Sequence, residues 1–217
     1  FKPDTELKYV YYYAPCENPS LDEKYPDMTP EQIAQELCTV HNVNLKDFLT
    51  KEQIDKIIDL KPEKYRCLRT VEDQHGHMEV MRMYNDNQKL PNEEEMSMVF
   101  NKFVAQSPMV AFADGYGARA LDNYGARGYY LVGYDKWFRH SLYNMGFDVK
   151  KLDLDNAADY DNVAVLVITD INEPLSETAL KNIYSYIDKG GDLYVLSNYK
   201  RGQYLEPVLN YVGAKYY

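Results

Sequence analysis

The chain has 217 residues, enough for one large or two small domains that each bury a core. Its formal net charge is −10 and it has no basic stripe, so recognition of nucleic-acid phosphates is not expected. No apolar run approaches the roughly 20 residues that a membrane-spanning helix needs.

Residues 1–107 are predicted to form a smaller α/β unit. Aromatic and β-branched residues run together at 7–13 and predict a strand. Thr29 and Thr50 each precede a glutamine by three residues, a capping-box pattern that predicts helices starting just after each threonine. The predicted buried face of the second helix is Ile54, Ile57 and Ile58.

A β-hairpin and a third helix are predicted to complete this unit. Strands at 65–72 and 78–84 flank Gly76, which can adopt the positive φ that a hairpin turn requires. Asn92 and the three glutamates after it predict the start of a helix. Its predicted inward face is Met96, Val99, Phe100 and Phe103. Residues 106–108 (Gln-Ser-Pro) end this helix and are the expected domain boundary.

Residues 108–217 are predicted to form a doubly wound α/β domain. Predicted strands lie at 109–113, 148–154, 163–169, 193–196 and 214–217, and predicted helices at 136–145, 177–189 and 203–211. This alternation favours a parallel sheet in the flavodoxin-like order 2-1-3-4-5 with helices on both faces. The apolar run at 163–168 is typical of a central strand covered on both faces.

Polar residues follow three of these strands, where the carboxyl ends of a parallel sheet form a ligand site. The candidate ligand-binding residues are Asp114, Tyr116, Gly117, Arg119, Asp170 and Asn198. The guanidinium of Arg119 and the ring of Tyr116 would suit an anionic or hydroxyl-rich ligand. Alternatively, Arg119 is a structural link from the loop to a carboxylate, and the other residues are ordinary polar loop residues. The tandem Tyr-Gly-Ala-Arg at 116–119 and 124–127 could present two guanidiniums to one anion.

The sequence contains no complete catalytic or metal-binding motif. There is no Gly-x-Ser-x-Gly elbow, and the three cysteines match neither a zinc pattern nor a disulfide framework. His75 and His77 lack a third ligand nearby in the sequence, and the acidic stretch at 153–161 lacks EF-hand spacing. No catalytic residue, cofactor or metal is therefore predicted, and the chain is interpreted as non-enzymatic.

Four segments in order carry a resemblance to a known family. They are residues 90–93 (Leu-Pro-Asn-Glu), the glycine-arginine loop at 114–119, residues 137–149, and residues 186–193, where a helix ends in Gly-Gly before an apolar strand. From Tyr9 onward this order resembles the auxiliary domain of ABC transport systems of the gliding-motility type. The fourth segment also resembles glutamine-amidotransferase-like sheets. The family often has Gly-His-Gly-Glu-Arg where this chain has Gly-Tyr-Gly-Ala-Arg at 115–119, so two ionisable groups are missing.

The resemblance implies an extracytoplasmic, periplasmic domain that acts with an ABC permease and ATPase and is attached to the membrane through segments outside this chain. It also implies that the first half is a thioredoxin-like or related small α/β unit, although no Cys-x-x-Cys is present for redox chemistry. The expected function is binding of a partner protein or a glycan. The alternative is a degenerate or unusual hydrolase on an amidotransferase-like sheet.

Overall fold

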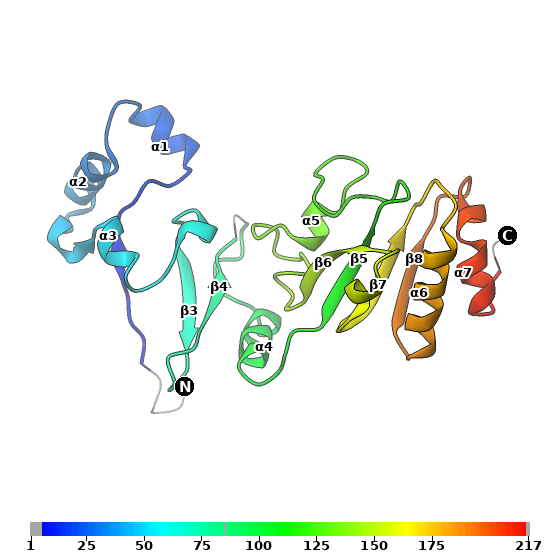
Figure 1. The fold of residues 1–217 in the computed structure, drawn as a ribbon. Coiled ribbons are helices and arrows are strands. Elements are labelled where there is room, and N and C mark those ends of the chain that lie inside the picture. Colours follow the sequence, from blue (N-terminus) through cyan, green and yellow to red (C-terminus); the bar gives the residue numbers. More distant parts are fainter. Residues whose placement is uncertain (1–5, 85, 216–217) are drawn as a thin grey trace. The chain divides into compact units, whose positions relative to one another are not determined.

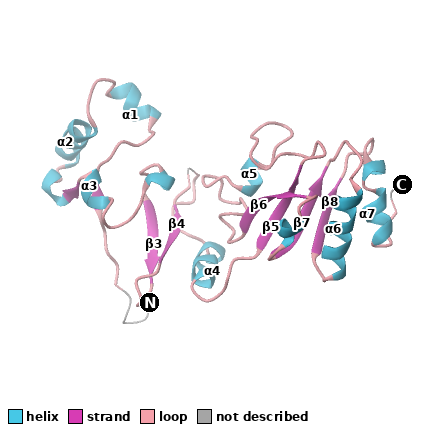
Figure 2. Ribbon diagram, in the orientation of Figure 1, coloured by secondary structure: helices cyan, strands magenta, loops and turns pink. Residues whose placement is uncertain are grey.

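The computed structural model describes residues 6–84 and 86–215 and is a mixed α/β structure (Figures 1 and 2). The chain divides into two compact units, residues 1–67 and residues 68–217. This division differs from the expected boundary at 107/108. The hairpin and the helix after it belong with the parallel sheet, because side chains of residues 82 and 95 bond to residues 144 and 139 of that unit.

The N-terminal unit contains short elements. β1 (Tyr11–Tyr12) pairs in parallel with β2 (Phe48–Leu49), so only two residues of the strand expected at 7–13 are in a strand. Its helices are α1 (Pro19–Lys24), α2 (Pro30–His41) and α3 (Lys51–Ile54), with 3₁₀ turns at Leu45–Asp47 and Lys61–Glu63.

The two capping boxes are confirmed. The hydroxyl oxygens of Thr29 and Thr50 accept from the backbone N–H of Gln32 and Gln53, and each glutamine side chain accepts from its threonine N–H. The predicted buried face of the second helix is wrong in part. Ile54 is buried, but Ile57 is 55% exposed because α3 ends after one turn and the helical spacing no longer applies.

The C-terminal unit begins with the predicted hairpin, which is confirmed: β3 (Leu68–Glu72) and β4 (Met78–Arg82) are antiparallel, and Gly76 has φ +81°. The next helix, α4 (Glu93–Lys102), starts at its predicted cap, Asn92. Its predicted inward face is only partly correct. Val99 is fully buried, whereas Met96 and Phe100 are exposed, because the helix turns Glu95 inward to pair with an arginine.

The sheet has four parallel strands in the order β6-β5-β7-β8. They are β5 (Met109–Asp114), β6 (Asp148–Asp153), β7 (Val163–Thr169) and β8 (Asp192–Leu196). This is the predicted order of the first four strands, with the apolar run of β7 inside the sheet. In the segment predicted as a fifth strand, residues 214–215 are not in a strand and residues 216–217 lie outside the described part.

The two faces of the sheet are covered differently. α6 (Glu177–Asp188) and α7 (Glu206–Tyr211) pack on one face and lie beside β8 in Figure 1. Ile183 of α6 is buried there together with Leu166 and Ile168 of β7. The other face is covered by the segment between β5 and β6, whose described structure includes the one-turn helix α5 (Tyr130–Gly133). The expected helices on both faces are therefore observed only in part, because the second face has a single helical turn and is otherwise covered by turns and loop.

The helix predicted at 136–145 is a series of turns instead. The buried side-chain amide of Asn144 donates to the carbonyl oxygens of Asp135, Lys136 and Phe138, at 3.2, 3.0 and 2.8 Å. Backbone N–H groups would occupy these acceptors in a helix. Because one side chain binds all three, the segment curls around Asn144 rather than extending as a helix.

Candidate functional site

Asp170 follows β7 at the carboxyl edge of the sheet. Its N–H donates to the carbonyl of Leu196 at 2.8 Å, which ties it to the end of β8. Its φ is +50°, a left-handed conformation that is uncommon outside glycine. The side chain is only 7% exposed. A buried carboxylate on an unfavourable backbone conformation at a sheet edge is typical of a functional site.

Three arginines surround the Asp170 carboxylate. Arg127 Nη1, Arg119 Nε and Arg201 Nη1 lie 3.0, 3.5 and 3.6 Å from Asp170 Oδ2. The first two come from the loop after β5 and the third from the loop after β8. Three positive charges and one negative charge give the cluster a formal charge of +2, in a chain whose net charge is −10.

The three guanidiniums repel one another. Each has a nitrogen within 3.6 Å of one oxygen, so these nitrogens are at most about 7 Å apart. At an effective dielectric constant of about 20, each pair of like charges at that separation costs on the order of 2 kcal/mol. One aspartate offsets this repulsion incompletely, and the cluster therefore favours a further anion.

Arg127 has the most structural contacts of the three. Its Nη1 donates to Asp170 Oδ2, and its Nη2 donates to the carbonyl of Gly117 at 2.7 Å and to that of Asp170 at 3.4 Å. Arg119 donates from Nη1 to the carbonyl of Ala126 at 2.9 Å, and the bridge between Ala120 and Gly128 closes the same loop. Arg127, and in part Arg119, link the loop at 115–129 to the end of β7.

Arg201 has a different environment. Its side chain is 34% exposed, and its guanidinium makes no hydrogen bond within the described residues. Its Nη1 and Asp170 Oδ1 are shielded from solvent and lack hydrogen-bond partners in the described part of the chain. Arg201 therefore retains donors that the fold does not use.

The loop after β5 depends on Gly117. Gly115, Tyr116 and Gly117 all have positive φ, and a Cβ on Gly117 would lie 1.9 Å from Asn172 Oδ1. Only glycine lets the Asn172 side chain approach this closely. The strained turn therefore sets the path of the chain toward Arg119.

We expect Gly117→Ala to lower the free energy of unfolding by about 1–2 kcal/mol for the left-handed backbone, with a further loss from displacing Asn172. Gly115→Ala is the control, because Gly115 has φ +95° but no atom within 4 Å of an added Cβ. Urea unfolding of both variants measures the difference. Equal losses would contradict a role for the contact with Asn172.

The other predicted residues have separate contacts. Asp114 lies 3.5 Å from Lys151, which also pairs with Asp122 at 2.8 Å and lowers the pKa of Asp122. Asn198 accepts from the Lys200 N–H at its side chain and from the Arg201 N–H at its carbonyl. It therefore builds the turn that carries Arg201.

Tyr116 does not line the same site as Arg119, although both were predicted to contact one ligand. Its hydroxyl donates to Asp155 Oδ2 at 2.5 Å, while the guanidinium of Arg119 lies 5.9 Å from the ring of Tyr129. The positive φ of Tyr116 belongs to the turn that separates these two side chains.

Of the predicted ligand-binding residues, the structure brings Gly117, Arg119 and Asp170 together. Arg127 and Arg201 were not in that set, although the repeated Tyr-Gly-Ala-Arg and the position after β8 could have indicated them.

Asp155 belongs to a second polar group, with Tyr116 and Ser176. The Ser176 hydroxyl donates to Asp155 and accepts from the Ala179 N–H as the N-cap of α6. Hydrogen bonds from Ser176 and Tyr116 lower the pKa of Asp155. A carboxylate stabilised in its charged form is a weak general base, so Ser176 is better explained as a cap than as an activated nucleophile.

The lowered pKa of Asp155 predicts a pH-dependent stability. The ionised form contributes stability above the ordinary aspartate pKa, and this contribution is lost as pH falls through the lowered folded-state value. We expect Asp155→Asn to melt below wild type at pH 7, and the difference to shrink as pH falls below about 4. Melting curves at pH 7, 5 and 3 test this, and a pH-independent difference would contradict it.

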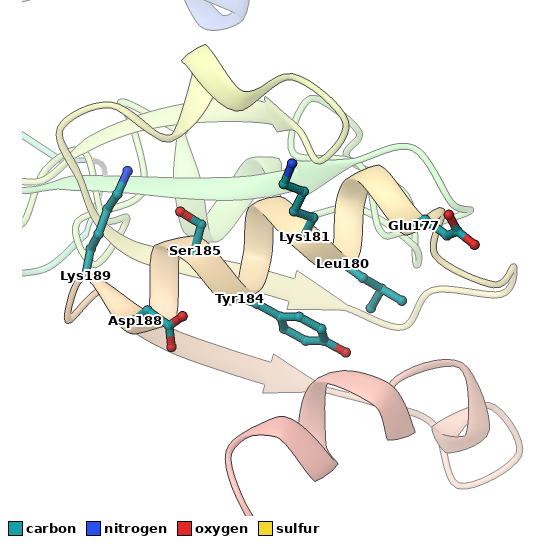
Figure 3. Close-up of a pocket in the computed structure, with 7 residues that line it drawn as sticks. All are labelled: Glu177, Leu180, Lys181, Tyr184, Ser185, Asp188 and Lys189. Carbon is teal, nitrogen blue, oxygen red and sulfur yellow. The ribbon is translucent and has the colours of Figure 1, made fainter.

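A shallow hollow of about 640 Å³ lies on α6 (Figure 3), and none of the three arginines lines it. The lining residues come from this one helix and its C-cap, Lys189: Glu177, Leu180, Lys181, Tyr184, Ser185, Asp188 and Lys189. Two acidic and two basic residues balance, and the ring of Tyr184 is stacked on Tyr211 at 3.9 Å. The hollow therefore has neither an excess charge nor a set of convergent polar groups.

Neither a candidate metal site nor a membrane-spanning helix is present in residues 6–84 and 86–215. This part of the chain contains no group of three or more His, Cys, Asp or Glu side chains placed to hold a metal ion. None of its helices has the length and apolar character needed to cross a membrane.

Comparison with known proteins gave no relative: no family model, curated protein or solved structure matches the chain. The arginine cluster at Asp170 is therefore the main basis for a function.

Proposed function

We propose that this chain is a non-enzymatic binding domain that takes a partner protein or a glycan at the carboxyl edge of its parallel sheet. One observation carries the proposal: three arginines from two loops converge on one buried aspartate and leave a formal excess of two positive charges. In open parallel α/β sheets, ligands bind outside the carboxyl ends of the strands.

The finer fold type belongs to the same proposal. The order β6-β5-β7-β8 equals the first four strands of the flavodoxin-like order 2-1-3-4-5. In that arrangement the first strand lies at the switch in strand order, and Arg119 and Arg127 follow this strand, β5. A flavodoxin- or amidotransferase-like sheet therefore supports binding at this edge.

The contacts around Asp170 favour binding over hydrolysis. Within the described residues, its side chain contacts arginine guanidiniums, and no serine, cysteine or histidine lies in the group as a nucleophile or base. Ser176, which belongs to the separate group around Asp155, is engaged as a helix cap, and the pKa of Asp155 is lowered. Guanidiniums bind anions and hydroxyl groups without proton transfer at neutral pH.

For the biological setting, we propose an auxiliary domain of an ABC-type transport or gliding-motility system, on the extracytoplasmic, periplasmic side. Its partners would be the permease and ATPase, and its membrane attachment would lie outside this chain. The support is the sequence resemblance, above all the glycine-arginine loop at 114–119, whose Arg119 is part of the cluster.

Site-specific photo-crosslinking in cells that produce the full protein tests this proposal. Tyr199 lies in the loop that carries Arg201 and is 76% exposed, so a photoreactive residue there should crosslink to a glycan or to the permease. Val104 is 82% exposed and follows α4, and the same residue there is the control. Equal crosslinking at both positions, or none at Tyr199, would reject the carboxyl edge as the binding site.

A further inference from the structure

We infer that Arg201, assisted by Arg119, binds a phosphate monoester group of the ligand, while Arg127 is a structural residue. This inference rests on the proposed binding function and names the chemistry that the site recognises. The arginines are not equivalent, because Arg127 makes hydrogen bonds to Asp170 and Gly117 whereas Arg201 makes none within the described chain.

The charge of the cluster indicates a dianion. Three guanidiniums and the Asp170 carboxylate have a formal charge of +2. A phosphate monoester carries about −1.5 to −2 at pH 7, so it neutralises the cluster, whereas a carboxylate leaves it positive. The residual repulsion between the guanidiniums therefore favours phosphate.

The donors of the cluster fit the same ligand. A guanidinium has five N–H donors in a planar fork that matches two phosphate oxygens. Arg201 has all of these donors unused within the described residues, and Arg119 uses Nη1 on the Ala126 carbonyl. Arg201 and Arg119 are each 34% exposed, so a phosphate can approach both side chains from solvent and meet donors other than the shielded Arg201 Nη1.

The neighbouring groups add selectivity. Asp170 Oδ1 is shielded from solvent and has no hydrogen-bond partner in the described structure, so it can accept from a ligand hydroxyl once the side chains over it move. Burial of this unpaired acceptor beside an unpaired donor is unfavourable without ligand. A phosphate with an adjacent hydroxyl, as in a phosphorylated sugar, supplies a partner for each: a phosphate oxygen accepts from the arginine, and the hydroxyl donates to the aspartate.

Calorimetric titration of the chain at constant ionic strength tests the inference. The probes are inorganic phosphate and glucose 6-phosphate, with glucuronate and glucose as the carboxylate and neutral arms. We expect both phosphates to bind, glucose 6-phosphate more tightly, and Arg201→Gln to weaken binding about tenfold to a hundredfold. Tighter binding of inorganic phosphate would reject the sugar phosphate in favour of free phosphate.

Matched variants separate binding from stability. Lys200→Gln removes the neighbouring charge in the same loop and should leave phosphate affinity within about twofold, and Arg201→Gln should leave the melting temperature unchanged. Arg127→Gln should lower the melting temperature because it removes the hydrogen bonds to Asp170 and Gly117. Equal losses of affinity in Lys200→Gln and Arg201→Gln would show nonspecific attraction and overturn the inference.

The remaining outcomes distinguish this inference from the proposed function. Absence of phosphate binding, or stronger binding of glucuronate, overturns the phosphate assignment. If crosslinking at Tyr199 persists in that case, the carboxyl edge is still the binding site and only the ligand chemistry is wrong. If crosslinking fails as well, both are rejected.

Discussion

Replacing Arg139 with methionine is expected to lower the free energy of unfolding by about 3–5 kcal/mol. Arg139 donates from Nε and Nη2 to Asp86 at 2.8 and 3.0 Å, and from Nη1 to Glu95. Glu95 is only 5% exposed, so removing the guanidinium leaves a buried carboxylate without this cation. Urea unfolding, monitored by the fluorescence of Trp137, measures the loss.

Two further variants determine whether charge burial causes this effect. Arg69→Met makes the same chemical change where the guanidinium bonds to the exposed carbonyl of Lys89, and it should cost about 1 kcal/mol or less. Adding Glu95→Gln to Arg139→Met should recover part of the stability, because the buried charge is removed. If Arg139→Met costs no more than Arg69→Met, the ion-pair explanation is wrong.

The elements that could be predicted from sequence have local causes. The capping boxes at Thr29 and Thr50, the glycine turn of the hairpin and the apolar run of β7 all act over a few residues. The order of the four parallel strands followed from β-strand and helix alternation and from the handedness of parallel connections.

Two errors arose where helical spacing alone did not decide which side chains are buried. Glu95 was not in the predicted inward face of α4, but a buried arginine 44 residues away in the sequence turns it inward. Likewise, α3 ends after one turn, so Ile57 is exposed although its spacing is helical. Sequence periodicity carries no information about either event.

The candidate site was predictable in position but not in composition. The rule for parallel sheets correctly brought Arg119 and Asp170 together, because it depends only on where strands end. The direction of each side chain depends on positive φ values at Tyr116 and Asp170, which rotate the chain so that Tyr116 reaches Asp155. Arg201 joins the cluster only because β8 lies beside β7, so its role required the three-dimensional arrangement.

Asn144→Leu is expected to lower the free energy of unfolding by on the order of 4 kcal/mol. The variant keeps a similar volume but removes the amide that donates to the carbonyls of Asp135, Lys136 and Phe138. The Asp135 and Phe138 carbonyls retain the N–H groups of Phe138 and Ser141. The main losses are therefore the bond to the Lys136 carbonyl and the bond that Arg82 Nη1 donates to Asn144 Oδ1, at about 1–3 kcal/mol for each buried bond removed.

Asn156→Ala is the control for Asn144→Leu. Asn156 accepts from the Ala158 N–H at the surface, so its loss should cost about 1 kcal/mol. Hydrogen exchange should also locate the damage, because the N–H groups of Leu142 and Tyr143 bond to the carbonyls of Val132 and Gly133 across the same turns. These two amides should exchange faster in Asn144→Leu than in Asn156→Ala. Unchanged exchange, or equal stability of the two variants, would mean that the turns covering this face of the sheet are held by packing and not by the amide of Asn144.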